Sequence, residues 1–354
     1  MSTATQGAAA RYGVLVRRRI LLLVVLATLA LAGFVADLMT GPSAIDLGTL
    51  VTTLFEPEAA SRANQVIVWN VRLPAALIAL LVGAILSLAG AETQTILNNP
   101  LASPFTLGVE AAASFGAATA IVLGIGLPWI SDNWMISANA FVFAFASTIL
   151  LQGVSRLRGR RPDTLILFGI AIFFTFNSLL ALIQFLASQE ALQQIVFWTM
   201  GSLARANWEK VGILCVVLAV LLPFSLSASW KLTALRLGED RARSFGINTT
   251  RLRLTTLLRI SLMTAAAVSF VGTIGFVGLV GPHIARLLTG EDHRFFLPAS
   301  LLSGAIIMAG ASIASKSLVP GILVPIGVGT SLIGIPSSPS CLSGRSGADE
   351  RRDA

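Results

Sequence analysis

Long apolar runs separated by short polar segments divide the chain, and this pattern restricts its fold more than any other feature. An α-helix needs about 20 apolar residues to cross the hydrocarbon core of a bilayer. Only 12% of the 354 residues are charged and the mean hydropathy is +0.82, which is too apolar for one soluble core. We therefore predict an all-α integral membrane protein with about ten transmembrane helices. The runs cover residues 19–38, 73–96, 106–127, 134–152, 164–187, 208–228, 254–273, 275–288, 296–315 and 321–336.

The basic residues test this threading independently. With a cytoplasmic N-terminus, all but five of the 25 lysines and arginines fall on the inner side, as the positive-inside rule requires. The five outer residues are Arg62, Arg72, Arg205, Lys210 and Lys316. Because the inner basic residues are spread over several short loops, they form no continuous patch for nucleic acid. The asymmetry predicts a multi-pass protein whose N-terminus is cytoplasmic.

The chain is expected to have one membrane domain with two polar flanks. Residues 1–18 form a cytoplasmic segment, residues 19–336 the polytopic domain, and residues 337–354 a polar tail that we expect to be disordered. The first run resembles a signal peptide, but it continues to about residue 38, which favours an uncleaved helix. The last run offers about 15 apolar residues, short of a full span, and the abrupt change after it is typical of a frameshifted or truncated end.

No residues for nucleotide chemistry are present. The chain has no GxxxxGK[ST] loop and only three lysines, so energy for transport would come from a partner or an ion gradient. An intramembrane enzyme would need paired catalytic groups at mid-membrane depth, and the aspartates all fall at predicted helix ends or in loops. Cys215 lies in an apolar run and Cys341 in the tail, so neither a disulfide nor CxxC metal chemistry is expected. We expect a transport subunit, with an ion-driven carrier or channel as an alternative.

The longest inner loop, residues 231–253, is the first candidate functional segment. A short helix is predicted over Leu235–Phe245, interrupted by Gly238 and capped at Gly246, with acidic and basic side chains alternating along it. Two interpretations are open: a solvated linker with positive-inside charges, or a coupling helix that docks onto a cytoplasmic partner.

Two further groups of polar residues are candidates for the pathway or for metal binding. The turn after the second run contains Asn99, Pro100 and Pro104, and Glu110 follows near the start of the third helix. Glu110 fits either a helix end, where its charge meets the positive dipole, or an intramembrane functional acid. His283 and His293 could hint at a metal, but no HExxH is present, so capping and loop packing are favoured and no metal site is predicted.

Three stretches of the sequence resemble the permease subunits of ABC importers for ferric siderophores, haem and cobalamin. They are LLVGAILSLAGAETQTILNNPLASPFTLGV at 80–109, LRLGEDRARSFGI at 235–247 and GFVGLVGPHIARLLTGEDHRFFLPASLLSGA at 275–305. The third is the most specific, and the resemblance covers about residues 66–336. The family motif in that stretch contains Pro282, His283, Arg286, Asp292, His293 and Arg294.

The resemblance implies the fold of the cobalamin importer permease, in a bacterial cytoplasmic (inner) membrane. It implies a second permease copy or a homologous permease, two ATP-binding subunits that carry ATP and Mg²⁺, and an extracytoplasmic substrate-binding protein; this chain itself would bind no cofactor. The coupling loop would use Arg236, Gly238, Glu239, Ala242 and Gly246.

The resemblance also assigns a docking site for the binding protein to Arg72 and Lys316. Ala75 stands where relatives often have a second arginine, so this patch is expected to be weaker or shaped for another partner. The favoured cargo is a ferric siderophore, with haem and cobalamin as alternatives, because the binding protein does most of the sorting of large cargo.

Overall fold

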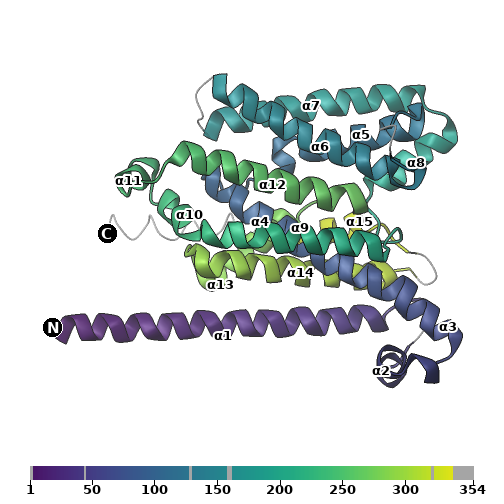
Figure 1. Ribbon diagram of the computed structural model, residues 1–354, viewed down its shortest axis with the longest axis horizontal. Helices are drawn as coiled ribbons and strands as arrows, with labels where there is room; N and C mark the ends of the chain where they lie inside the picture. Colours follow the sequence, from purple (N-terminus) through teal and green to yellow (C-terminus); the bar gives the residue numbers. More distant parts are fainter. Residues whose placement is uncertain (1–2, 44, 127–129, 158–161, 320–322, 338–354) are drawn as a thin grey trace.

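The computed structural model describes residues 3–43, 45–126, 130–157, 162–319 and 323–337, and these residues form helices and irregular segments without a strand (Figure 1). The polar tail therefore lies outside the described residues. In chain order the elements are α1 (Thr3–Met39), α2 (Leu47–Phe55), η1 (Pro57–Ala59), α3 (Arg62–Gln65), η2 (Val66–Arg72), α4 (Leu73–Ile96), η3 (Pro104–Leu107), α5 (Val109–Leu123), α6 (Asp132–Leu157), α7 (Pro162–Leu186), α8 (Gln189–Thr199), α9 (Trp208–Ser227), α10 (Ser229–Arg236), α11 (Glu239–Ser244), α12 (Thr249–Val271), α13 (Val277–Thr289), α14 (His293–Ser317) and α15 (Ile326–Ser337).

Each predicted apolar run contains a helix, which confirms the all-α membrane fold. Within the described ranges, seven helical stretches are long and apolar enough to cross a bilayer, and one falls on each of α1, α4, α6, α7, α9, α12 and α14. The other three runs contain the shorter helices α5, α13 and α15. At about 1.5 Å per residue, the 12 residues of α15 rise about 18 Å, well short of a bilayer. The exact number of crossings stays a prediction.

Two segments that lie outside the predicted apolar runs, α2 and α8, are helical. Asp46 caps α2 by accepting a hydrogen bond from the Thr49 amide, and Ser188 caps α8 by accepting one from the Ala191 amide. Both helices are amphipathic and shorter than a membrane span, so a search for long apolar runs misses them. In addition, α1 begins at Thr3, so most of the predicted N-terminal segment continues the first helix.

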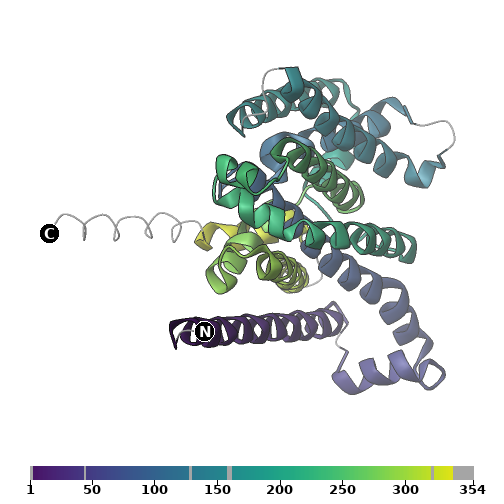
Figure 2. The same ribbon diagram turned by 60° about the vertical axis from the view of Figure 1, so that its left-hand side comes forward.

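Helix α4 lies at the centre of the bundle. The most apolar stretch of its span is 83% buried, compared with 17% for α1, which lies at the periphery (Figures 1 and 2). α4 packs against α9, α12, α13 and α14, while α5, α6 and α7 form a layer beyond α12. Gly83 of α4 faces Gly304 of α14, and the Ser87 hydroxyl donates to the Ser300 carbonyl at 2.6 Å. The small side chains at these positions of α4 therefore allow close packing against α14.

The long helices run along a common direction, and most of the described basic residues gather at one end of the bundle, which we call the basic end (Figure 1). There Arg19 of α1 pairs with Asp292 before α14 at 3.4 Å, and Arg236 of α10 pairs with Glu291 at 2.8 Å. Helices α2, α3 and α8 lie at the opposite end. Segments predicted to share the cytoplasmic side thus share one end of the molecule, as the threading requires.

Candidate functional site

The predicted coupling loop forms two short helices at the basic end. It begins earlier than predicted, at Ser229, and the break falls at Gly238, whose φ of 109° introduces α11. Gly246 has a φ of 77° directly after the cap of α11, as the sequence predicted. Ala242 is fully buried and fixes α11 against the bundle core. The loop therefore presents α11 as a compact helical tip.

Glu239 joins this tip to the start of α12. Its carboxylate pairs with Arg253 at 3.0 Å and with Arg243 at 2.6 Å, and it accepts a hydrogen bond from Thr249. Partial burial raises the pKa of the Glu239 carboxyl, but the Arg253 charge, the Thr249 hydrogen bond and the Arg243 charge together lower it below its ordinary value. The carboxylate form is therefore stabilised in the folded protein, and α11 moves with α12.

A polar network connects α10 to the central helices. The Glu291 carboxylate accepts hydrogen bonds from Arg236 at 2.8 and 3.2 Å and pairs with Arg286 of α13 at 2.9 Å. Arg236 also donates to Asn98, just beyond α4, at 2.8 Å, and Arg286 donates to Gln94 within α4 at 2.8 Å. Bidentate arginine–carboxylate pairs hold their geometry well. Glu291, which sequence reasoning did not single out, is therefore the centre of the network.

The remaining motif residues lie around this network. His293 is fully buried, with Nε2 2.8 Å from the Thr95 hydroxyl and Nδ1 3.2 Å from the Thr233 hydroxyl. Asp292 caps α14 and also pairs with Arg294 at 2.7 Å, and hydrogen bonding from Arg294 lowers the pKa of its carboxyl.

The two histidines occupy different surroundings. His283 is half-buried on α13, where the preceding Pro282 is buried inside the helix. In the described ranges no three metal-binding side chains lie together, and His293 fills a packing role between α4 and α10.

The inner-turn candidates separate into two groups. Asn99 and Pro100 lie in the turn at the basic end, where the Asn99 side chain accepts a hydrogen bond from the Leu101 amide. Pro104 is buried at the first position of η3, and Glu110 lies in the first turn of α5. The helix-end position predicted for Glu110 is therefore present, while a functional role inside the membrane stays a prediction.

Three segments of the chain meet inside the bundle near Glu110: residues 199–202, 271–276 and 324–327. Helix α12 ends at Gly272, with a φ of 80°, and Glu110 lies beside Thr273 in the break before α13. The Ser202 amide donates to the Val271 carbonyl at 2.7 Å.

The same cluster includes the start of α15. The Ile326 and Gly327 amides donate to the Gly201 and Met200 carbonyls at 3.1 and 3.0 Å. Such backbone is tolerated at membrane depth only inside protein or beside a water-filled cavity. The break between α12 and α13 is thus held by hydrogen bonds within this cluster.

An ion pair inside the bundle also escaped the sequence analysis. Arg259 of α12 donates to the Glu92 carboxylate of α4 at 2.9 Å, and Glu92 is fully buried. An acidic and a basic residue within two predicted spans were a usable signal, because intramembrane charges are costly unless paired.

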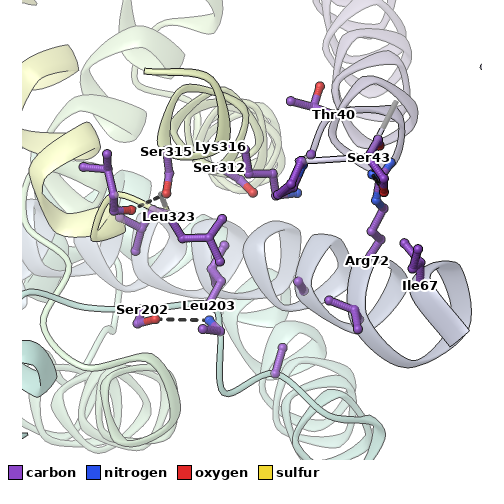
Figure 3. A pocket seen from close by; sticks show the side chains of 18 of the residues that line it. Thr40, Ser43, Ile67, Arg72, Ser202, Leu203, Ser312, Ser315, Lys316 and Leu323 are labelled. Atoms are coloured by element: carbon purple, nitrogen blue, oxygen red, sulfur yellow. Dashed lines mark hydrogen bonds between the residues drawn. The ribbon is translucent and has the colours of Figure 1, made fainter. Parts of the chain in front are cut away.

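The two predicted docking residues line one cavity at the end opposite the basic end, but their charges face inward (Figure 3). Arg72 is 5% exposed and donates to the carbonyls of Leu38, Met39 and Ser43. Lys316 pairs at 2.7 Å with Asp37, which is 1% exposed. Both side chains therefore hold the end of α1. Their docking role stays a prediction.

Comparison with known proteins adds independent information. Residues 7–337 match the FecCD transport family. A protein of Methanocaldococcus jannaschii named as an ABC transporter permease is 36% identical over 77% of this chain and 80% of its own length. The Fe(3+) dicitrate transport system permease FecD of Escherichia coli is 35% identical over 89% of this chain and 96% of its own length. Other matched relatives are named for molybdate, hemin and vitamin B12 import.

A solved structure agrees with the sequence comparison. A protein described as a metal-chelate type ABC transporter, in an inward-facing conformation, superimposes with a TM-score of 0.81 at 32% identity. The match covers 91% of this chain and 98% of that chain. The resemblance seen in the sequence motifs is therefore confirmed. The chain belongs to the FecCD transport family and is a multi-pass membrane permease of the ABC importer type.

Proposed function

We propose that this chain, paired with a second permease copy or a homologous permease, forms the membrane pathway of an importer for a ferric siderophore. Two ATP-binding subunits dock at the basic end and supply the energy, so ATP and Mg²⁺ bind to them and this chain carries no cofactor. An extracytoplasmic binding protein delivers the iron chelate at the opposite end. The lipid bilayer surrounds the pair.

The observation that carries this proposal is the connection between α10–α11 and the central helices. Arg236 joins α10 to Glu291, and Arg286 joins Glu291 to α13. A displacement of the helical tip would therefore act directly on α4, α13 and α14. A solvated linker needs no such network, so the coupling interpretation is favoured over the linker interpretation.

The break between α12 and α13 supplies a pathway element that such a displacement can move. Phe276, the residue before α13, has a φ of 66°, which is strained for a side chain of this size. The break is held by hydrogen bonds between separate segments, so a shift of α13 exchanges a few bonds while the long helices stay intact. Glu110 faces the same region from α5.

The binding protein is proposed to dock over the outer cavity of about 410 Å³ that Arg72 and Lys316 line. Both cations are engaged with the end of α1, so their contribution to docking would be indirect, through the shape of the cavity rim. Ala75 lies in the same lining, where relatives often carry a second arginine.

Reconstituted transport tests both the class and the cargo. The permease is placed in proteoliposomes with its ATP-binding subunits and binding protein, and uptake of a ferric siderophore, haem, cobalamin and molybdate is compared. ATP-dependent siderophore uptake that ceases in the absence of ATP is the expected result. Uptake driven by an ion gradient without the ATP-binding subunits would overturn the class, and preference for another cargo would overturn the siderophore assignment.

A further inference from the structure

A second cavity lies at the basic end, on the side of the bundle formed by α9 and α12. It has a volume of about 680 Å³ and opens between two helix junctions, α9–α10 and α11–α12. Of the five coupling residues, Gly246 lines it, whereas Arg236, Gly238, Glu239 and Ala242 do not. The described lining residues are Phe224, Ser227, Ala228, Trp230, Lys231, Phe245, Gly246, Ile247, Asn248, Arg251, Leu252, Thr255 and Arg259.

The charges of the lining have one sign. Lys231, Arg251 and Arg259 are cationic, and none of the described lining residues is acidic. Arg259 is buried and engaged with Glu92, while the exposed side chains of Lys231 and Arg251 form no hydrogen bond or ion pair within the described ranges. Two uncompensated cations beside a cavity of this size favour an anionic group.

The remaining walls are aromatic and continue into an apolar stripe. The Trp230 and Phe245 rings lie tilted by 45° at a centroid separation of 6.3 Å, and both side chains are more than half exposed. Phe224 begins a stripe with Val220 and Val216, spaced four residues apart on one face of α9 and all exposed. Exposed aromatic side chains at a helix end are typical of the interface between headgroups and acyl chains. A ligand for this site thus has a charged head and an apolar chain.

We propose that the cavity binds an anionic phospholipid of the inner leaflet, with its phosphate between Lys231 and Arg251 and an acyl chain along the α9 stripe. The site is positioned beside the junction between α11 and α12, because Gly246 and Asn248 belong to its lining. A bound lipid would therefore contact the segment that carries the coupling tip without occupying the tip itself.

Native mass spectrometry of the full chain in detergent tests the proposal, with phosphatidylglycerol and phosphatidylcholine as probes. The double variant Lys231→Gln/Arg251→Gln should lower the apparent affinity for phosphatidylglycerol about 30-fold, since each cation near the headgroup contributes about a factor of five. Phosphatidylcholine retention should be unchanged. The charge-matched control Arg17→Gln/Arg241→Gln removes two exposed arginines of the basic end that do not line the cavity, and it should bind like the wild type.

Two further measurements distinguish binding of the lipid from binding of other anions. Phe224→Gln should weaken phosphatidylglycerol binding while leaving any binding of inorganic phosphate unchanged, because only the lipid uses the apolar stripe. Displacement of the lipid by millimolar inorganic phosphate, or equal losses in the control variant, would overturn the proposal. So would a double variant that keeps phosphatidylglycerol but no longer co-purifies with the ATP-binding subunits, because the cavity would then belong to that partner.

Discussion

The Arg259 guanidinium of α12 lies 2.9 Å from the Glu92 carboxylate of α4, and the pair joins two of the most buried helices of the bundle. Removing one member leaves the other charge buried without a partner, which typically costs about 3–5 kcal/mol. We expect Glu92→Ala to lower the unfolding free energy by that amount, and Glu92→Leu/Arg259→Met to recover most of it. Denaturant unfolding in detergent provides the measurement. A double variant as unstable as the single one would show that the pair contributes more than charge compensation.

The contact between Lys316 and Asp37 should be structural. Replacing Lys316 with Met removes the ion pair of the buried Asp37 carboxylate and leaves only the nearby Arg72 charge, so a loss of about 3 kcal/mol in unfolding free energy is expected. Arg62→Gln, which removes an exposed cation of the same end, should leave stability unchanged. Binding-protein association measured over a salt series separates the roles: an effect on association rate at full stability would identify Lys316 as a docking charge.

Gly238 should be required for coupling because of its backbone conformation. Open space surrounds the position, but its φ of 109° is strained for any residue with a side chain. Gly238→Leu should uncouple ATP hydrolysis from uptake while leaving the membrane fold intact. Gly212→Leu in α9 is the matched control, because Gly212 is helical and equally open. Normal transport by Gly238→Leu in proteoliposomes would mean that the loop is only a linker.

Acid should loosen the attachment of α10 to α14. Partial burial raises the pKa of Glu291, but the Arg236 hydrogen bonds and the charges of Arg286 and Arg236 lower it below its ordinary value. The stabilisation that the Glu291 carboxylate supplies is therefore fully present above its unfolded pKa of about 4.3. It is lost as the pH falls through the folded pKa. Hydrogen exchange of residues 229–248 should accelerate over that window. Glu291→Gln should exchange faster already at neutral pH and lose this pH dependence; an unchanged profile would assign the acid response elsewhere.

The sidedness of the bundle can be tested by cysteine labelling. Cysteines introduced at the exposed positions Arg62 and Arg205 should react with an impermeant reagent from outside, and a cysteine at Arg243 only from inside. Because Cys215 is exposed on α9, it should be replaced by Ser before the scan. Labelling of position 243 from outside would invert the threading.

The apolar pattern predicted where helices occur because lipid requires long apolar segments, and each of the ten runs contains one. It could not predict α8, since Gln189, Glu190, Gln193 and Gln194 give that helix a polar face and a length of 11 residues.

Pairing was equally hidden from the sequence analysis. Arg72 and Lys316 were correctly placed at the end opposite the basic end, but their partners come from the end of α1. Arg72 bonds to Leu38, and Lys316 pairs with Asp37, which lies much farther away along the sequence. Likewise, Glu291 stood inside a recognised motif, yet its contacts with Arg236 and Arg286 come from α10 and α13. Spacing along one helix predicts neighbours on that helix, whereas these contacts depend on how separate helices pack.

The hydrogen bonds around Gly201 have a consequence for insertions and deletions. Ser202 is bonded to Val271, and Gly201 and Met200 accept bonds from Ile326 and Gly327, so three distant segments share one register. Adding a residue between Met200 and Ser202, or between Ile326 and Gly327, would displace at least one of these bonds. The tip around Gly238, in contrast, has open space around it. Natural length variation among such permeases should therefore concentrate at the tip, and segments 199–202, 271–276 and 324–327 should keep their lengths.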